Sequence, residues 1–205
     1  MTAQPFPERL WWCEHVVDPA DDPKFGNPTF YEYYREKYEL ALAAAPTAIA
    51  EIGVRYGYSA WSFLCAAPAA SYTGFDRQLG THGGVKGVDT FAAVAALLAR
   101  DFPAAAVHLV RADTQTLADS LPGGPFDLIH VDGDHSEPGC THDLERALAA
   151  CRSGGSILID DYDYIAGVRR AVDRFTRDYA DRIAGQRYVA TLRGDIVLTV
   201  REGRA

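Results

Sequence analysis

Short apolar runs alternate with helix-forming segments along most of this chain, and that alternation restricts the folds open to it. The runs predicted to be strands are residues 48–52, 72–75, 107–110, 126–131 and 156–159. The predicted helices are residues 29–44, 58 onward, 89–102, 114–120 and 138–151. Strands joined through helices form parallel sheets, and nearly continuous apolar strands are typical of sheets covered on both faces. The sequence therefore predicts an α/β fold with helices on both faces of a parallel sheet.

The C-terminal part of the chain changes this pattern. Apolar residues from Ile165 to Ile183 recur at spacings of three and four, which predicts one further helix. Two apolar runs follow, Tyr188–Leu192 and Ile196–Val200, separated by only three residues. A parallel crossover needs a longer connection, so we expect a hairpin and an antiparallel last strand.

Length and composition indicate one folded domain. The 205 residues are 48% hydrophobic and 23% charged, as in ordinary water-soluble domains. Residues 1–28 contain five prolines and predict an irregular arm or lid, and residues 29–205 predict the core. Trp11 and Trp12 in the arm could pack onto the domain, cover a site or form a subunit contact, so a homodimer stays open.

Charge and cysteine content narrow the partners. Lys and Arg number 20 against 28 Asp and Glu, and the net charge of -8 disfavours nucleic acid and anionic membranes. The first 20 residues lack the apolar run of a secretory signal, and four scattered cysteines suggest reduced thiols. We therefore expect a cytoplasmic protein without nucleic-acid or membrane partners.

A glycine-containing turn follows the first predicted strand and leads into a helix: Glu51-Ile52-Gly53-Val54-Arg55-Tyr56-Gly57-Tyr58-Ser59-Ala60. Glycines let a ligand approach the backbone, and a helix start offers free N–H groups to a carboxylate or phosphate. The glycine spacing does not fit the dinucleotide fingerprint or a P-loop, which disfavours a nicotinamide-dependent oxidoreductase. Asp76, at the end of the second strand, could accept both hydroxyls of a ribose. A nucleoside without a pyrophosphate fits this pair of features.

Acidic residues follow two later strands. Asp132 and Asp134 come after residues 126–131, and Asp160 and Asp161 come after residues 156–159. If these strands are neighbours, Asp132, Asp160 and Asp161 converge at the rim of the sheet. Such carboxylates must be protonated, paired with cations or bound to a metal, for which Mg²⁺ is the natural choice. The alternative is that they cap the following helices.

These residues resemble class I S-adenosylmethionine (SAM)-dependent methyltransferases, in particular the metal-dependent O-methyltransferases of the catechol type and of the macrolide- and aminocoumarin-sugar type. The resemblance covers about residues 30–200. It is carried by the Glu51–Ala60 motif and by Asp132 with Asp160-Asp161. It implies a Rossmann-like sandwich with a seven-stranded, mostly parallel sheet whose last strand is antiparallel, in agreement with the predicted hairpin.

The resemblance also implies roles for individual residues. Glu51 and Gly53 would line the methionine end of SAM, Ser59 its carboxylate, Asp76 its ribose and Asp113 its adenine. The full set implied to bind SAM is Glu51, Gly53, Tyr58, Ser59, Asp76, Asp113 and Asp132. The implied metal ligands are Asp132, Asp160 and Asp161, and the implied base is Asp134 or His135.

The departures from the family bear on the base and on the acceptor. Catechol enzymes carry Asn in place of Asp161 and a Lys base in place of His135, whereas an acid placed like Asp134 is the proposed base of the sugar enzymes. The expected activity is SAM-dependent, metal-assisted O-methylation of a catechol-like phenol or a sugar diol of a natural product. The alternatives are a metal-independent N- or carboxyl methyltransferase and a non-catalytic nucleoside-binding accessory protein.

Overall fold

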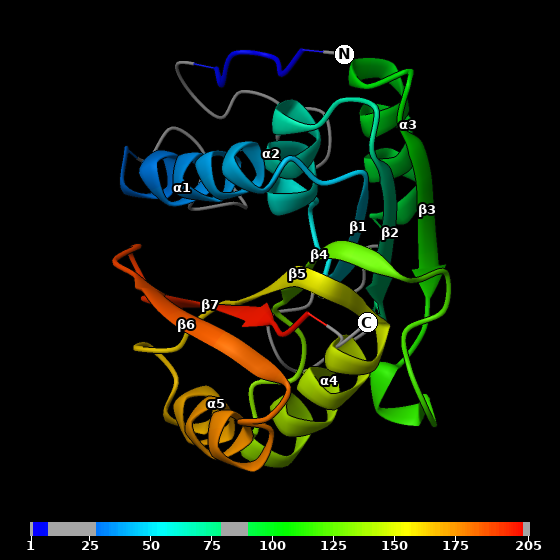
Figure 1. The fold of residues 1–205 in the computed structure, drawn as a ribbon. Coiled ribbons are helices and arrows are strands. Elements are labelled where there is room, and N and C mark those ends of the chain that lie inside the picture. Colours follow the sequence, from blue (N-terminus) through cyan, green and yellow to red (C-terminus); the bar gives the residue numbers. More distant parts are fainter. Residues whose placement is uncertain (1, 8–27, 79–89, 203–205) are drawn as a thin grey trace.

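The computed structural model describes residues 2–7, 28–78 and 90–202 (Figure 1). Most of the predicted arm, with Trp11 and Trp12, lies outside the described residues, as does Asp89 at the expected start of a helix. None of the described helices has the length and apolar character needed to cross a membrane.

Helices and strands alternate as the sequence predicts. The helices are α1 (Pro28–Ala44), α2 (Tyr58–Ala66), α3 (Phe91–Asp101), α4 (Glu137–Ala150) and α5 (Ala166–Asp178), with one 3₁₀ turn, η2 (Thr114–Thr116). The strands are β1 (Ala48–Ile52), β2 (Ser71–Asp76), β3 (Ala106–Arg111), β4 (Phe126–Val131), β5 (Cys151–Ile159), β6 (Ile183–Val189) and β7 (Asp195–Val200).

The seven strands form one sheet in the order β3-β2-β1-β4-β5-β7-β6. β7 is antiparallel to both of its neighbours, and the other pairs are parallel, which confirms the predicted topology. The strand order reverses between β1 and β4, and such a switch point is where ligands bind in open α/β sheets. Ile52 of β1 pairs with both Phe75 of β2 and Val131 of β4, so these strands end at one level.

Two hydrophobic cores hold the helices to the sheet. Figure 1 shows α1 and α2 on one side of the sheet and α4 and α5 on the other. Alternate strand residues enter the two cores, because successive side chains of a strand point to opposite faces. Ile49 packs with residues of α1, α2 and α3, whereas Ala50 and Ile52 pack with residues of α4 and α5. This double burial explains why the inner strands are continuously apolar.

Two expected boundaries are wrong at the C-terminal end. The helix ends at Asp178, and Ile183 instead begins β6. Ile183 is still buried in the core beside α4 and α5, but it reaches that core from a strand. Its helical spacing was therefore coincidental. β6 covers residues 183–189 rather than 188–192, because its interior residues are exposed and leave no apolar pattern to detect.

Two other elements differ in length from the prediction. β5 begins at Cys151, directly after α4, and not at Ser156. The short helix expected at residues 114–120 is only the single turn η2, whose N-cap residue is Asp113.

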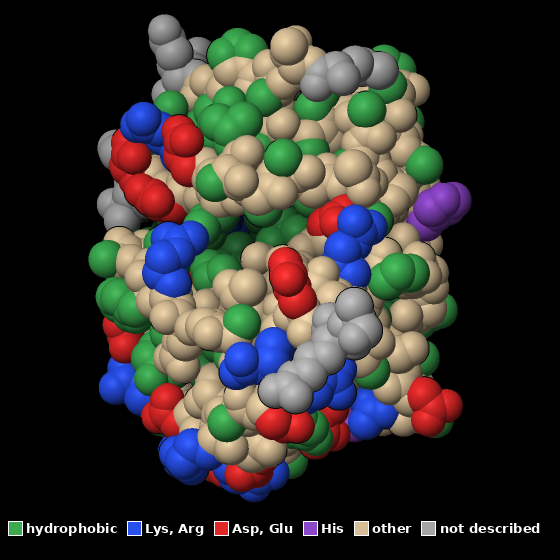
Figure 2. All heavy atoms as spheres, in the orientation of Figure 1, with side chains coloured by type: hydrophobic (Ala, Val, Ile, Leu, Met, Phe, Trp, Pro, Cys, Tyr) green, Lys and Arg blue, Asp and Glu red, His purple; other side chains and the backbone are tan. Residues whose placement is uncertain are grey.

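A hollow with hydrophobic side chains at its floor opens between α1 and strands β5–β7 (Figure 2). This cavity of about 340 Å³ is lined by Leu40 of α1, Leu158 of β5 and Val197 of β7, among others. Its walls are mostly apolar, which sets it apart from the larger cavity at the carboxyl ends of the strands.

The turn after β1 depends on Gly53. Its φ is +91°, and a Cβ there would lie 2.0 Å from the carbonyl oxygen of Asp132. We expect Gly53→Ala to lower the free energy of unfolding by at least about 2 kcal/mol, because the left-handed backbone and the clash both oppose a side chain. The matched control is Gly185→Ala, where no atom lies within 4 Å of the added Cβ. Equal stabilities in urea denaturation would contradict the prediction.

Candidate active site

A cavity of about 530 Å³ opens at the carboxyl ends of the parallel strands, beside the switch point. The residues predicted to bind a ligand that line it are Gly53, Tyr58, Ser59, Asp76, Asp113, Asp132, Asp134, His135 and Asp161. Glu51 and Asp160 are not among the lining residues, since both are buried directly behind it. α1 adds Tyr33 and Tyr34 to the wall, and the loop between β6 and β7 adds Arg193.

The turn between β1 and α2 presents a helix start to the cavity. Gly53, Arg55 and Gly57 all have positive φ, which lets five residues reverse the chain direction. Gly57 is the N-cap of α2 and provides no side-chain cap. The start of α2 therefore faces the cavity without a side-chain cap, as suits the carboxylate or phosphate that the sequence motif predicts.

Glu51 lies behind this turn in a buried hydrogen-bonded network. Its carboxylate accepts hydrogen bonds from the hydroxyls of Ser59 and Tyr72. Nδ1 of His130 lies 2.9 Å from Glu51 Oε1. Glu51 thus reaches the cavity wall through Ser59.

Two acids at the ends of β2 and β3, on the same side of the switch point as β1, are held by backbone amides. Asp76 accepts hydrogen bonds from the N–H groups of Arg55, at 2.8 Å, and Gln78. Asp113 accepts from the N–H of Gln115 at 3.1 Å and pairs with Arg77 at 3.1 Å. Both carboxylates are thus fixed in the wall, at the positions predicted for ribose and adenine.

Asp160 is surrounded by donors of the protein itself. Its Oδ2 accepts from the Tyr33 hydroxyl and lies 3.3 Å from Nζ of Lys37, and its Oδ1 accepts from the N–H of Asp161. Burial alone would raise the pKa of Asp160, but the Lys37 ammonium and the His130 ring outweigh it and hold that pKa well below its ordinary value. The Lys37 ammonium is fully buried and also lies 3.2 Å from Asp195 Oδ2.

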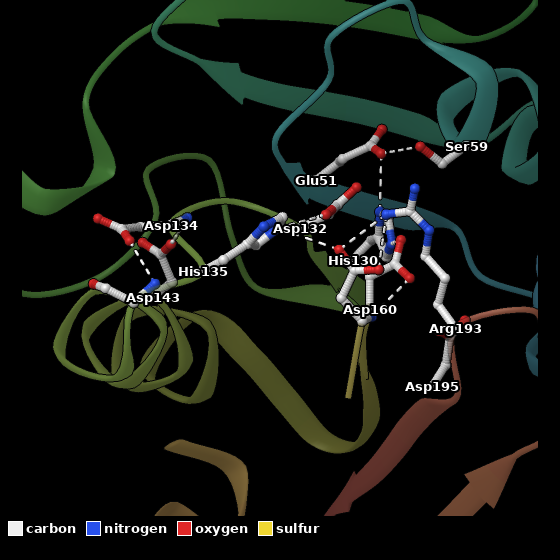
Figure 3. Close-up of polar contacts among 12 residues, drawn as sticks. Glu51, Ser59, His130, Asp132, Asp134, His135, Asp143, Asp160, Arg193 and Asp195 are labelled. Atoms are coloured by element: carbon white, nitrogen blue, oxygen red, sulfur yellow. Dashed lines mark hydrogen bonds and ion pairs between the residues drawn. The ribbon is translucent and has the colours of Figure 1, made fainter. Parts of the chain in front are cut away.

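Asp132 and Asp161, together with His135, face the cavity. Nε2 of His135 lies 3.1 Å from Asp132 Oδ1 and 3.6 Å from Asp161 Oδ2 (Figure 3). Nη1 of Arg193 contacts both oxygens of Asp161, at 2.9 and 3.1 Å. Burial and the neighbouring carboxylates of Asp160 and Asp132 raise the pKa of Asp161, and Arg193 opposes that rise. β4 and β5 are paired neighbours, so the predicted convergence of Asp132 with Asp160 and Asp161 is confirmed.

The arrangement fits a divalent cation at one of two places. Asp132, His135 and Asp161 bring one ligand atom each within 4.8 Å of one another, as do His130, Asp132 and Asp160. Neighbouring ligands of an octahedral ion lie roughly 3 Å apart, close to the distances around His135. The group of His130, Asp132 and Asp160 already has a cation beside it, the Lys37 ammonium, whose Nζ lies 3.3 Å from His130 Nε2. The carboxylates that would hold a cation are therefore Asp132 and Asp161, beside His135. Asp160 is held by Lys37, and a cation would share Asp161 with Arg193.

Asp134 and His135, the two candidate bases, point in different directions. Asp134 accepts a hydrogen bond from the N–H of Ser136 at 2.8 Å and packs against Gly139 at the start of α4. Figure 3 shows its side chain beside Asp143, away from the group around Asp132. Of the two, only His135 is therefore directed to the group around Asp132 and Asp161.

Three buried charged residues of this region, Lys37, Asp143 and Asp195, escaped the sequence analysis, and the first two lie on helices. Lys37 shares the apolar face of α1 with Tyr34, Tyr38 and Ala41, and Asp143 lies among the buried residues of α4. A single charge on the apolar face of a predicted helix was the available signal.

Comparison with known proteins supports this description of the fold. A sequence model of a protein family described as a methyltransferase domain matches residues 50–162, more than half of the chain. No curated protein matches at a significant level.

Solved structures with the same fold include three methyltransferases. The O-methyltransferase TomG of Streptomyces achromogenes, involved in tomaymycin synthesis and solved with SAM, is 19% identical, with a TM-score of 0.65 over 95% of this chain and 91% of that one. A Podospora anserina methyltransferase solved with SAH is 18% identical, with a TM-score of 0.67 over 98% and 91%. An O-methyltransferase of Bacillus cereus solved with SAH is 16% identical, with a TM-score of 0.60 over 92% and 86%.

Asp143 makes the stability of the fold depend on pH. Burial raises the pKa of Asp143 to about 6, although hydrogen bonds from Thr114 and from the Asp134 N–H oppose the shift. The folded state therefore binds this proton more tightly than the unfolded state. The stabilisation is complete below about pH 4 and is lost as the pH rises through 6. We expect the unfolding free energy of the wild type to fall more steeply from pH 4 to 7 than that of Asp143→Asn; equal slopes in urea titrations would refute this.

Proposed function

This chain belongs to the methyltransferase-domain family, and from that premise we propose that it transfers the methyl group of SAM to a hydroxyl oxygen of a small molecule, assisted by a divalent cation. The observation that carries the proposal is the division of one cavity into two parts. Asp76 and Asp113, both held by backbone amides, line one part with the β1–α2 turn, and Asp132, His135 and Asp161 line the other.

The first part suits SAM. The uncapped start of α2 offers N–H groups to the methionine carboxylate. Asp76 and Asp113 offer carboxylate oxygens to the ribose hydroxyls and the adenine amino group.

The second part suits an acceptor hydroxyl and its proton. The acceptor oxygen attacks the methyl carbon in line with the sulfur–carbon bond; the carbon–oxygen bond forms as the sulfur–carbon bond breaks, which yields SAH. His135 takes the proton of the hydroxyl. Asp132 and Asp161, with His135 as neighbour, would hold the cation, which when bound lowers the pKa of the acceptor hydroxyl and fixes its direction.

The chemistry of the wall favours a cyclic acceptor with two adjacent oxygens. Tyr33 and Tyr34 of α1, together with Tyr164 after β5, present aromatic rings to the cavity. A catechol ring or a sugar ring could pack against them while its two oxygens reach a cation held by Asp132 and Asp161. We also propose that the protein works in the cytoplasm as a homodimer, without nucleic acid or membrane partners. Sedimentation tests the homodimer.

One observation favours a second candidate, methyl transfer without a metal. Lys37 and Arg193 already pair with Asp160 and Asp161 and compensate their charge. In that case the acceptor would be a nitrogen or carboxylate nucleophile that needs no help to lose a proton. The described residues give no support to a non-catalytic accessory role.

Binding of SAM is the first test. We expect calorimetry to give a micromolar dissociation constant, which corresponds to a binding free energy of about -8 kcal/mol. Asp76→Asn should weaken binding about tenfold, because an amide offers one acceptor oxygen in place of the two of a carboxylate. Asp178→Asn, an exposed acid of α5, is the control and should bind normally. Unchanged binding by Asp76→Asn would place the ribose elsewhere, and no binding by the wild type would refute the proposal.

Turnover identifies the base and the role of the metal. With catechols and sugar diols as acceptors, we expect SAH release to stop in a chelator and to return with Mg²⁺. His135→Ala should lower kcat about a hundredfold or more, because general base catalysis contributes that much. Asp134→Asn should lower kcat far less, and His108→Ala, a histidine of β3 outside the cavity, serves as the control.

The opposite results would redirect the proposal. Full activity in the chelator would favour the metal-independent candidate. A larger loss in Asp134→Asn than in His135→Ala would make Asp134 the base.

A further inference from the structure

Asp143 of α4 lies beneath the cavity and touches two of the loops that form its wall. Its Oδ1 accepts hydrogen bonds from the Thr114 hydroxyl at 2.6 Å and from Nε2 of Gln115 at 2.9 Å. Its Oδ2 accepts from the N–H of Asp134 at 3.3 Å. One buried carboxylate thus joins the loop after β3 to the loop after β4.

The loop after β4 is built around this carboxylate. A Cβ on Gly133 would lie 2.6 Å from Asp143 Oδ2 and 2.7 Å from Cγ2 of Ile52. Gly133 therefore lets the backbone approach Asp143 closely enough for the Asp134 N–H to donate. The direction of the chain just after Asp132 follows from this contact.

The loop after β3 is tied to the same face of α4 at further points. Nε2 of His142 lies 3.0 Å from the carbonyl oxygen of Thr114, and Gln115 also donates to the carbonyl oxygen of Gly139 at 3.3 Å. The guanidinium of Arg146 donates to the carbonyl oxygen of Ala118. A single turn of 3₁₀ helix has little stability of its own, so the position of this loop depends on α4.

We infer that Asp143 is a positioning residue that holds the loop after β3, on the adenosine side of the proposed SAM site, at a fixed spacing from the loop after β4. The inference rests on the proposed function and extends it to a residue that does not line the cavity. Thr114 and Gln115 follow Asp113 directly, and Asp134 follows Asp132 and Gly133. Loss of Asp143 would shift mainly the loop after β3, with Asp113 and Gln115 on the adenosine side. The loop after β4 keeps two other anchors, the hydrogen bond from the Asp132 N–H to the carbonyl oxygen of Ile52 and the cap of α4 by Ser136, so His135 stays beside Asp132. Loss of Asp143 should therefore weaken SAM binding and leave turnover at saturating SAM nearly unchanged.

Two variants of Asp143 remove either one or both of its acceptor oxygens. Asp143→Asn keeps the volume but offers one acceptor oxygen in place of two, and should weaken SAM binding about fivefold. Asp143→Ala removes both and should weaken it more than tenfold. Thr114→Val removes the hydroxyl on the other side of the contact. If the contact acts as one unit, Asp143→Ala with Thr114→Val should bind SAM about as well as Asp143→Ala alone.

Asp127 provides a matched control. Its Oδ2 also accepts three hydrogen bonds, from the Thr47 hydroxyl and from the N–H groups of Thr47 and Ala48, but it ties the opposite ends of β1 and β4. Asp127→Asn should therefore lower the unfolding free energy without changing the SAM dissociation constant. This control separates positioning from a general loss of stability.

The experiment measures the SAM dissociation constant by calorimetry, kcat at saturating SAM, and the unfolding free energy of each variant. Graded weakening, non-additivity and a constant kcat support the inference. Binding by Asp143→Asn and Asp143→Ala within twofold of wild type, full additivity, or equal weakening by Asp127→Asn would overturn it. If Asp143→Ala does not fold, Gln115→Ala tests the contact from the loop side, and normal binding by that variant overturns the inference. A wild type that fails to bind SAM would instead refute the proposed function.

Discussion

The contact between Lys37 and the buried acids holds together the centre of this molecule. Asp160 and Asp195 lie at adjoining ends of β5 and β7, where few water molecules could solvate them. Removing one partner from such a group leaves an uncompensated buried charge, which typically costs several kcal/mol. Lys37 supplies the missing charge from α1, and with it fixes where α1 lies on the sheet. The aromatic wall of the cavity, Tyr33 and Tyr34, therefore owes its place to an ion pair one turn away.

Because of this contact, the acids at the rim of the sheet have different roles. Asp160 is occupied by Lys37 and the Tyr33 hydroxyl, so it serves the packing of α1. Asp132 and His135 are 32% and 28% exposed, and with Asp161 they face the cavity. Two neighbouring residues, Asp160 and Asp161, thus point to different partners, which the left-handed backbone of Asp161, with φ of 61°, makes possible.

Periodic patterns of apolar residues predicted most of the fold. The features that these patterns missed depend on contacts between distant segments of the chain. Strand and helix alternation identified β1 to β5 and the antiparallel β7. Burial on both faces leaves continuous apolar runs in the inner strands, and the edge strand β3 was found from its apolar run alone. β6 was misplaced, since its exposed interior leaves no such run. In the site, Asp132 and Asp161 could be found because they end apolar strands. The roles of Lys37 and Asp143 could not, because they depend on pairings with residues 123 and 29 positions away.

The reversed direction of β7 brings the last part of the chain to the rim. Because β7 runs against β5, its first residue, Asp195, and the preceding loop with Arg193 lie beside the end of β5, where Asp160 and Asp161 begin. The final strand also inserts between β5 and β6 rather than adding at an edge. During synthesis, Asp161 would thus acquire its guanidinium partner only after the 32 residues that lead to Arg193 have been made. The insertion of β7 and the pairing of Asp161 are then one event, so a chain cut short before Arg193 would lack both.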